Sequence, residues 1–373
     1  MNYTNKLVRF TPNRVWRSYT GGKILDQLEQ KSVPEDTHFP EDWIGSTTQA
    51  VNPDRKAIVE GISHAIIGDE VIRFDELIAL DPGYFLGEQH CRAFEFNPML
   101  LVKFLDSSVR LHFQAHPSAE FAREHLNSNH GKAEGYYILD VREGINDPYV
   151  YVGFQYPPSR SAFKEMIATQ NISAIEACFE KIPVKAGDCL FIPGGSPHAI
   201  GEGILMVEIM EPSDWAVRFE FSKSGYTMPE EARFMKRDLD FCMDVFDFTK
   251  LSVPEAVEKF FQSPKVERYY GDNSFQETLI DENITDKFRV KKSTISGTVK
   301  KTEQDFYIGI VVNGECNIKI GKEAVQLKKF DRFFCPAGVD VATISTESAV
   351  EILECYPPTV NKCKSSNNNK AEV

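Results

Sequence analysis

The sequence predicts a mainly β protein built from barrel-like sheets. Residues 182–210 and 287–357 form two series of short apolar segments separated by Gly and Pro, a pattern typical of barrel strands joined by tight turns. Aromatic residues make up 12% of the chain and 27 of them are Phe, which favours packing between sheets. Residues 229–263 differ in character, because Pro229 and Pro254 each open a charged, helix-prone stretch. We therefore expect a helical insertion between the two β-rich regions.

The first half of the chain is predicted element by element. Residues 1–55 should form loops around short strands, because they are mixed and polar and carry Gly21-Gly22 and the segment that begins at Pro40. The apolar run 99–105 predicts a buried strand, and 109–115 alternates in polarity as a second strand would. Residues 118–126 contain good helix formers, and Ser118 is suited to cap the helix at its N-terminus.

Further strands are predicted at 136–141 and 149–154. Residues 162–179 have helical composition, but the Asn-Ile-Ser stretch that begins at Asn171 should divide them into two short helices. The Val-Asn-Gly-Glu stretch at 312–315 indicates a β-hairpin, because Asn-Gly favours the tight turns that join antiparallel strands.

Composition limits the kinds of partner to expect. The 373 residues are enough for two or three packed units, and a formal net charge of −13 argues against a surface that binds nucleic acid. A small anion remains compatible with a local basic pocket. Eight cysteines without a CxxC pair favour reduced thiols, and neither a signal peptide nor an apolar run of the ~20 residues that a membrane span needs is present. We expect a cytoplasmic protein that does not enter membranes.

The most specific motif ends at His198. It begins at Gly187 and continues through Pro193 and Gly195, so that a strand leads into a glycine-bearing turn two residues before the histidine. This spacing resembles the second conserved motif of the cupin superfamily, in which the turn directs the histidine into a barrel. The alternative is an ordinary β-turn followed by an incidental histidine.

Two further motifs carry candidate metal ligands. Gln114 and His116 are two apart on a predicted strand, so both side chains point to the same face, although an ordinary edge strand would show the same pattern. The Gly-Lys-Ala-Glu stretch from Gly131 to Glu134 adds a carboxylate, which would neutralise a divalent cation. By itself that stretch is more often a solvated loop.

Taken together, the three motifs resemble those of the type I mannose-6-phosphate isomerases, which show Q-x-H-P, G-K-T-E and P-x-G-x-x-H-A-I-G in this order. The likeness extends over about residues 40–220. It implies one divalent metal per chain, for which zinc is the family's usual choice, although the ligand chemistry also permits iron or manganese. The metal ligands implied by the resemblance are Gln114, His116, Glu134 and His198.

The resemblance also implies three catalytic residues. Lys103 interrupts an apolar run where an unpaired ammonium would be costly to bury, so it should reach a polar pocket rather than extend along the surface to water. Lys132 lies two residues before Glu134, and Arg218 alternates away from the apolar face of its own segment. His112 shares a strand face with Gln114 where the family usually has Ser, and it could contact the substrate phosphate or join the metal ligands.

The C-terminal region echoes the first barrel. Residues 330–341 repeat the P-x-G turn, but Val341 stands where the histidine would be, which predicts a degenerate second cupin barrel without metal. The expected fold is thus two jelly-roll-like cupin barrels with a helical insertion. The expected divisions are a metal-bearing domain, an insertion with linker, the degenerate barrel and a disordered tail, at 1–225, 226–286, 287–360 and 361–373.

The function implied by the resemblance is the interconversion of mannose 6-phosphate and fructose 6-phosphate through an enediol, with a sugar phosphate as the small-molecule partner. Two alternatives belong to other classes. One is a cupin that binds a sugar or a sugar phosphate without turning it over, and the other is an iron-dependent cupin dioxygenase. The sequence leaves the catalytic base and the oligomeric state open.

Overall fold

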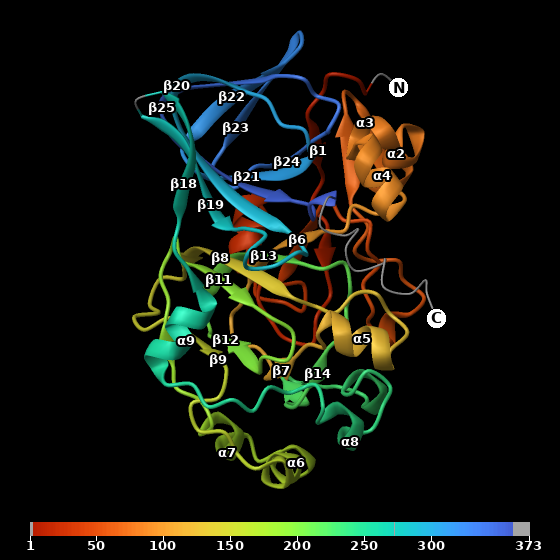
Figure 1. Ribbon diagram of the computed structural model, residues 1–373, viewed down its shortest axis with the longest axis vertical. Coiled ribbons are helices and arrows are strands. Elements are labelled where there is room, and N and C mark those ends of the chain that lie inside the picture. Colours follow the sequence, from red (N-terminus) through yellow and green to blue (C-terminus); the bar gives the residue numbers. More distant parts are fainter. Residues whose placement is uncertain (1–2, 272, 361–373) are drawn as a thin grey trace, which may run out of the picture.

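The computed structural model describes residues 3–271 and 273–360, and it is mainly β, as predicted (Figure 1). The predicted disordered tail at 361–373, which includes Cys363, lies outside the described residues. The seven described cysteines are free thiols. None of the described helices combines the length and the apolar character that crossing a membrane requires.

Two antiparallel sheets enclose the core nearest to the candidate site. In spatial order, the seven-stranded sheet contains β17 (Phe261–Gln262), β11 (Cys189–Ile192), β8 (Glu134–Val141), β13 (Ile204–Met210), β6 (Leu101–Asp106), β3 (Glu41–Ile44) and β2 (Arg14–Val15). The five-stranded sheet contains β10 (Ile182–Pro183), β9 (Tyr149–Val152), β12 (His198–Ile200), β7 (Gln114–Ala115) and β14 (Val217–Arg218). Side chains from both sheets, such as Met206 and Ile200, share one apolar core.

A third sheet packs against the outer face of the seven-stranded sheet, where Val207 and Leu353 belong to one apolar cluster. In spatial order this eleven-stranded sheet contains β18 (Lys265–Gly271), β19 (Ser274–Ile280), β20 (Arg289–Lys301), β25 (Ala342–Tyr356), β21 (Tyr307–Asn313), β24 (Arg332–Cys335), β1 (Val8–Phe10), β4 (His64–Ile67) and β5 (Glu70–Arg73). In addition, β22 (Glu315–Ile320) pairs with β25, and β23 (Glu323–Lys328) pairs with β22. Three strands from the start of the chain thus lie in the same sheet as the C-terminal strands. The predicted domain divisions at 225, 286 and 360 stay a prediction.

Short helices lie at one end of the molecule and along its sides (Figure 1). They are α1 (Lys23–Leu28), α2 (Phe74–Leu80), α3 (Pro82–Leu86), α4 (Glu88–Phe94), α5 (Ala119–His125), α6 (Arg160–Ala168), α7 (Ile172–Glu176), α8 (Leu239–Cys242) and α9 (Val253–Phe260). Two 3₁₀ turns, η1 (Pro53–Arg55) and η2 (Glu230–Ala232), and the small hairpin of β15 (Ser222–Lys223) and β16 (Tyr226–Thr227) complete the description. The predicted cap of α5 is present, because the Ser118 hydroxyl accepts a hydrogen bond from the backbone N–H of Phe121 at 3.1 Å. The predicted break between α6 and α7 is also present.

Three local predictions were wrong. The strand expected at 109–115 is reduced to β7, because the backbone N–H of Phe113 donates to the Glu220 carboxylate at 3.2 Å instead of to a neighbouring strand. The stretch at 312–315 makes a turn but no hairpin, since β21 and β22 each pair with a different part of the long strand β25. Pro229 precedes only the 3₁₀ turn η2 rather than an extended helix, whereas the stretch with Pro254 does form α9.

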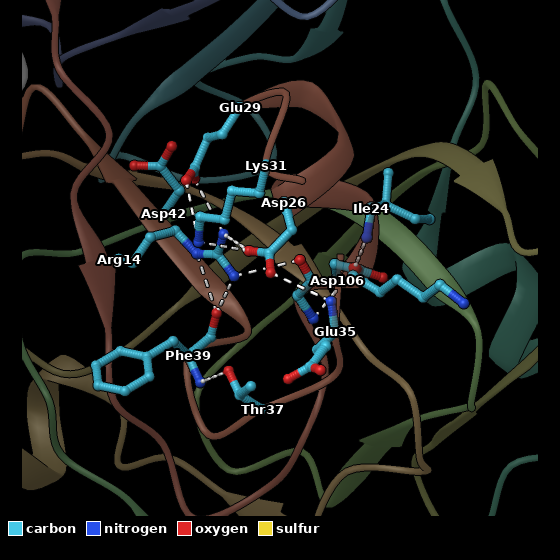
Figure 2. A network of polar contacts seen from close by, with 12 residues as sticks. Arg14, Ile24, Asp26, Glu29, Lys31, Glu35, Thr37, Phe39, Asp42 and Asp106 are labelled. Atoms are coloured by element: carbon cyan, nitrogen blue, oxygen red, sulfur yellow. Dashed lines mark hydrogen bonds and ion pairs between the residues drawn. The ribbon is translucent and has the colours of Figure 1, made fainter. Parts of the chain in front are cut away.

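A network of ion pairs holds the N-terminal segment against the strands that carry the site (Figure 2). Arg14 on β2 donates to Asp26 at 2.8 Å and to Glu29 at 3.0 Å, and Lys31 donates to Asp26 at 2.7 Å. The carboxylate of Asp106, at the end of β6, accepts the backbone N–H of Ile24 at 2.7 Å. Strands β2 and β3 are thereby fixed beside β6, where Trp43 on β3 lies opposite Lys103 and Glu41 lies opposite Leu105.

Candidate metal centre and substrate pocket

Three buried side chains from separate motifs converge on one point between the two inner sheets. Nitrogen or oxygen atoms of His116, Glu134 and His198 all lie within 4.8 Å of one another. Nε2 of His116 lies 3.2 Å from one carboxylate oxygen of Glu134, and Nε2 of His198 lies 3.5 Å from the other. Among the described residues, this is the one such group of His, Cys, Asp and Glu that could hold a metal ion.

Strand pairing brings these residues together. Glu134 is the first residue of β8 in the seven-stranded sheet, whereas His198 begins β12 in the five-stranded sheet. Gln114 on β7 lies directly opposite His198, and its side-chain amide is 3.4 Å from Nε2 of that histidine. His116 follows β7, two residues beyond Gln114. The two sheets therefore contribute all four predicted ligands to a single cluster.

Glycines in the motifs permit a close approach of the loops that carry these ligands. A Cβ atom at Gly131 would lie 2.5 Å from the carbonyl oxygen of Pro117, and one at Gly194 would lie 2.5 Å from the Cα atom of Ser118. Such distances leave no room for a side chain. The Gly-Lys-Ala-Glu loop and the P-x-G turn thus both pack on the Pro117–Ser118 backbone, directly after His116.

Hydrogen bonds orient both histidines toward the cluster. Nδ1 of His116 lies 2.8 Å from the Trp215 carbonyl oxygen, and Nδ1 of His198 lies 2.9 Å from the Ser196 carbonyl oxygen. A carbonyl oxygen only accepts, so each Nδ1 carries the proton and each Nε2 presents a lone pair. Burial lowers the pKa of His116 to about 3 and also lowers the pKa of His198, which keeps both rings neutral.

The donor set fits a divalent metal. Two neutral imidazoles, a carboxylate and an amide are suitable ligands for zinc, iron or manganese, and histidines held through Nδ1 are typical of metal sites. Burial opposes the ionisation of Glu134, but the Lys132 ammonium beside it helps to hold its pKa well below the usual range. The ammonium group of Lys132 contacts the Glu134 carboxylate and lies 3.2 Å from Nε2 of His116. A positive charge is therefore favoured beside the Glu134 carboxylate, within this cluster of ligands.

A polar cavity adjoins the cluster, and the three residues predicted to be catalytic line it. The ammonium of Lys103 is buried, as predicted from its cost in an apolar run, and lies 2.8 Å from Glu208 and 3.5 Å from Glu41. Arg218 on β14 lies opposite Gln114 and donates to the carbonyl oxygen of Ala232 at 3.2 Å. Lys132 and Arg17 also line the cavity.

The cavity adjoins a wider hollow of about 320 Å³. Arg17, Asp214 and Arg218 line both, so these side chains mark the boundary between the narrow inner part and the outer part. Aromatic residues including Trp16 and Tyr226 form part of the outer wall. The outer hollow thus lies directly beside the buried charges of the inner cavity.

Several residues of the pocket lie outside the three sequence motifs. The carboxylate of Glu41 accepts hydrogen bonds from Arg17 at 2.8 Å, from Tyr19 at 2.5 Å and from the indole N–H of Trp43 at 2.8 Å. Glu208, on β13, has its pKa raised to about 8 by burial. The sequence holds only a weak signal for Arg17 and Tyr19. They follow Val15 at intervals of two residues and so continue the alternation of β2.

His112 lines the cavity but lies outside the metal-ligand group defined above. Its Nδ1 is 3.0 Å from the Glu220 carbonyl oxygen, and its Nε2 is 3.4 Å from the carbonyl oxygen of Ser18. Burial lowers its pKa to about 4, so the ring is neutral at pH 7. A neutral ring carries one N–H, so His112 donates to only one of these two carbonyl oxygens, of which that of Glu220 is the nearer.

The chain is similar to known proteins in sequence and in fold. A family model described as mannose-6-phosphate isomerase, cupin domain, matches residues 281–354, which lie in the eleven-stranded sheet and the loops that join its strands. The chain is 28% identical over 239 residues to a mannose-6-phosphate isomerase of Streptococcus mutans, covering 64% of this chain and 68% of that protein. It is also 28% identical over 243 residues to mannose-6-phosphate isomerase ManA of Bacillus subtilis, covering 64% and 70%.

Solved structures show the same fold. The crystal structure of a mannose 6-phosphate isomerase from Bacillus subtilis superimposes with a TM-score of 0.71 at 21% identity, covering 93% of this chain and 99% of that one. A mannose 6-phosphate isomerase structure bound with zinc and yttrium gives a TM-score of 0.68 at 14% identity, covering 95% and 100%. The chain is therefore similar to mannose-6-phosphate isomerases in sequence, shares the fold of their solved structures, and carries a region that matches their cupin domain.

Proposed function

We propose that this protein interconverts mannose 6-phosphate and fructose 6-phosphate, an aldose–ketose isomerisation through an enediol. The observation that carries the proposal is the cavity in which a His116–Glu134–His198 cluster adjoins the buried pair of Lys103 and Glu208. A metal-binding cluster beside titratable groups is what a proton transfer next to a carbonyl requires. The names of the relatives given above point to the same reaction.

We propose that His116, Glu134, His198 and Gln114 hold one divalent metal, which we take to be zinc. A bound zinc ion supplies positive charge that stabilises the negative charge developing on the substrate oxygens. The observation in favour of zinc is the mixed set of imidazole nitrogens and oxygens, together with the zinc-bound structure among the similar ones.

The reaction also needs a group that removes the proton at C2 of the aldose and returns a proton at C1. We assign this role to the pair of Lys103 and Glu208, which are 2.8 Å apart and buried at the cavity. Burial raises the pKa of Glu208 to about 8, close to neutral pH, where a carboxyl group can both accept and release a proton. Glu41 lies 3.5 Å from the same ammonium and helps to hold it in place.

Arg218 and Lys132 are the proposed partners of the remaining negative charge of the substrate. Arg218 stands where the cavity meets the outer hollow, which suits an arginine that binds a phosphate group with two parallel hydrogen bonds. Lys132 sits at the inner end, against Glu134. We further propose that the protein acts in the cytoplasm, because its seven described cysteines are free thiols.

The test is the His198→Ala variant, with His125→Ala as the matched control because His125 is exposed on α5. Loss of one ligand should lower the metal content of the purified protein and reduce the isomerase rate by at least about 100-fold, while the circular dichroism spectrum stays unchanged. Metal analysis and a mannose 6-phosphate assay measure both. Full metal content in His198→Ala would contradict the site, whereas metal and sugar-phosphate binding without turnover in the wild type would contradict catalysis.

A further inference from the structure

Tyr136 on β8 lies beside the metal-ligand cluster but belongs to none of the three sequence motifs. Successive side chains of a strand point to opposite faces, so Tyr136 shares the face of Glu134, two residues earlier. Gly135, between them, faces the eleven-stranded sheet, because a Cβ atom there would lie 2.8 Å from Cδ1 of Ile280. Tyr136 is 1% exposed and lines the inner cavity. Its side chain is therefore enclosed among the groups of the site.

The Tyr136 side chain approaches two of the proposed metal ligands. Its hydroxyl group donates a hydrogen bond to Oε2 of Glu134. Its ring lies edge to face with that of His198, with ring centroids 6.4 Å apart and an interplanar angle of 61°. Glu134 comes from the seven-stranded sheet and His198 from the five-stranded sheet. One tyrosine thus lies against ligands from both sheets.

The two oxygens of the Glu134 carboxylate have different partners. Oε1 contacts the ammonium group of Lys132 and lies 3.2 Å from Nε2 of His116. Oε2 accepts the hydroxyl proton of Tyr136 and lies 3.5 Å from Nε2 of His198. A carboxylate oxygen has two lone pairs, so Oε2 can accept this hydrogen bond and still bind a metal ion. Donors at both oxygens fix the rotation of the carboxylate plane.

We propose that Tyr136 is a positioning residue for the metal, whose hydroxyl group holds the Glu134 carboxylate in the orientation that binds a divalent cation. Groups that hold a metal ligand by a hydrogen bond raise metal affinity, and their loss typically weakens it by about 10- to 100-fold. A phenylalanine would keep the ring beside His198 but could not donate to Oε2. The inference rests on the proposed metal site and assigns no step of the isomerisation to the tyrosine.

Tyr136→Phe tests the role of the hydroxyl group, because it removes that group alone. We expect the dissociation constant of the full-length protein for zinc, measured by competition with a chelator, to rise about tenfold. Tyr137→Phe is the matched control, since the neighbouring tyrosine is also buried but packs toward the eleven-stranded sheet and does not line the cavity. That control should bind zinc as the wild type does. Wild-type affinity in Tyr136→Phe, or the same loss in both variants, would overturn the proposal.

A double-mutant cycle shows whether the hydroxyl group acts through Glu134. In a Glu134→Ala background, Tyr136→Phe should change the zinc dissociation constant less than about twofold, because the hydroxyl group has lost its acceptor. A tenfold loss in that background would mean that the tyrosine supports the fold of the cluster in general, and the positioning role would be wrong. A wild type that binds no zinc would refute the metal site and this role together. No turnover is measured, so failure of the isomerase assignment would be seen separately.

Discussion

At the scale of single residues, the cavity depends on histidines that burial keeps neutral. His112 shows the effect most simply, because its two nearest polar partners are backbone carbonyl oxygens at 3.0 and 3.4 Å, which are uncharged. Its pKa is lowered to about 4, chiefly by burial, from an ordinary value near 6.5. The folded protein therefore resists protonation of a ring that the unfolded chain protonates readily.

This difference predicts how acid affects stability. The unfolded chain binds a proton at His112 below about pH 6.5, whereas the folded protein does so only near pH 4, so the contribution of His112 is complete above pH 6.5 and is lost as the pH falls. Between pH 7 and pH 4, the wild type should lose as much as about 3 kcal/mol more unfolding free energy than His112→Ser. Urea denaturation at several pH values measures this, with His125→Ser as the exposed control. Parallel curves for the wild type and His112→Ser would refute the prediction.

At the scale of elements, the metal cluster depends on loops that meet over a short piece of backbone. The turn that contains Gly194 leads to His198, and it packs on the Pro117–Ser118 backbone, which directly follows His116. These loops are joined by packing and by single backbone hydrogen bonds, such as that from the N–H of Gly195 to the His116 carbonyl oxygen at 2.7 Å, rather than by strand pairing. A small displacement of one loop would therefore move its ligand relative to the others.

Gly194→Ala should therefore affect metal binding and stability together. The added methyl group would lie 2.5 Å from the Cα atom of Ser118, so one loop must shift, at a cost of about 1–3 kcal/mol. We expect the dissociation constant for zinc, measured by competition with a chelator, to rise at least about tenfold. The control Gly225→Ala tests backbone strain without a steric clash, because Gly225 has a φ of 76° but open space around it. That control should lose some stability and keep its metal affinity; weaker zinc binding in both variants would contradict the explanation.

The difference between local contacts and contacts distant in sequence explains which features the sequence could predict. The P-x-G turn, the pair of Gln114 and His116, and the Ser118 cap are local patterns, and each side chain lies where its spacing predicts. The network around Glu41 could not be predicted in this way, because its partners Arg17 and Tyr19 lie more than twenty positions away. The turn at 312–315 has correct hairpin chemistry, yet pairing with the 15-residue strand β25 separates its two strands.

At the scale of the whole molecule, the three sheets form consecutive layers, with the seven-stranded sheet in the middle. One face of that sheet packs toward the metal cluster, and the other packs on the eleven-stranded sheet. Asp42 on β3 connects the seven-stranded sheet to the eleven-stranded sheet, because its carboxylate pairs with Arg332 on β24. The same carboxylate also accepts the backbone N–H of Asn13 at 2.8 Å. The next residue toward the N-terminus, Glu41, belongs to the cavity, so the C-terminal sheet supports the strand that carries it.

Arg332→Ala tests how strongly the two sheets depend on this pair. The Asp42 side chain is only 4% exposed, and burial raises its pKa even with Arg332 beside it, so removal of the guanidinium leaves a buried carboxylate with one remaining donor. The free energy of unfolding, measured with guanidinium chloride at pH 7, should fall by about 2–4 kcal/mol. The double variant Arg332→Ala/Asp42→Asn removes the unpaired charge and should regain at least about 1 kcal/mol of this loss. A single variant as stable as the wild type, or a double variant as unstable as the sum of both single variants, would mean that the pair contributes nothing to the contact between the sheets.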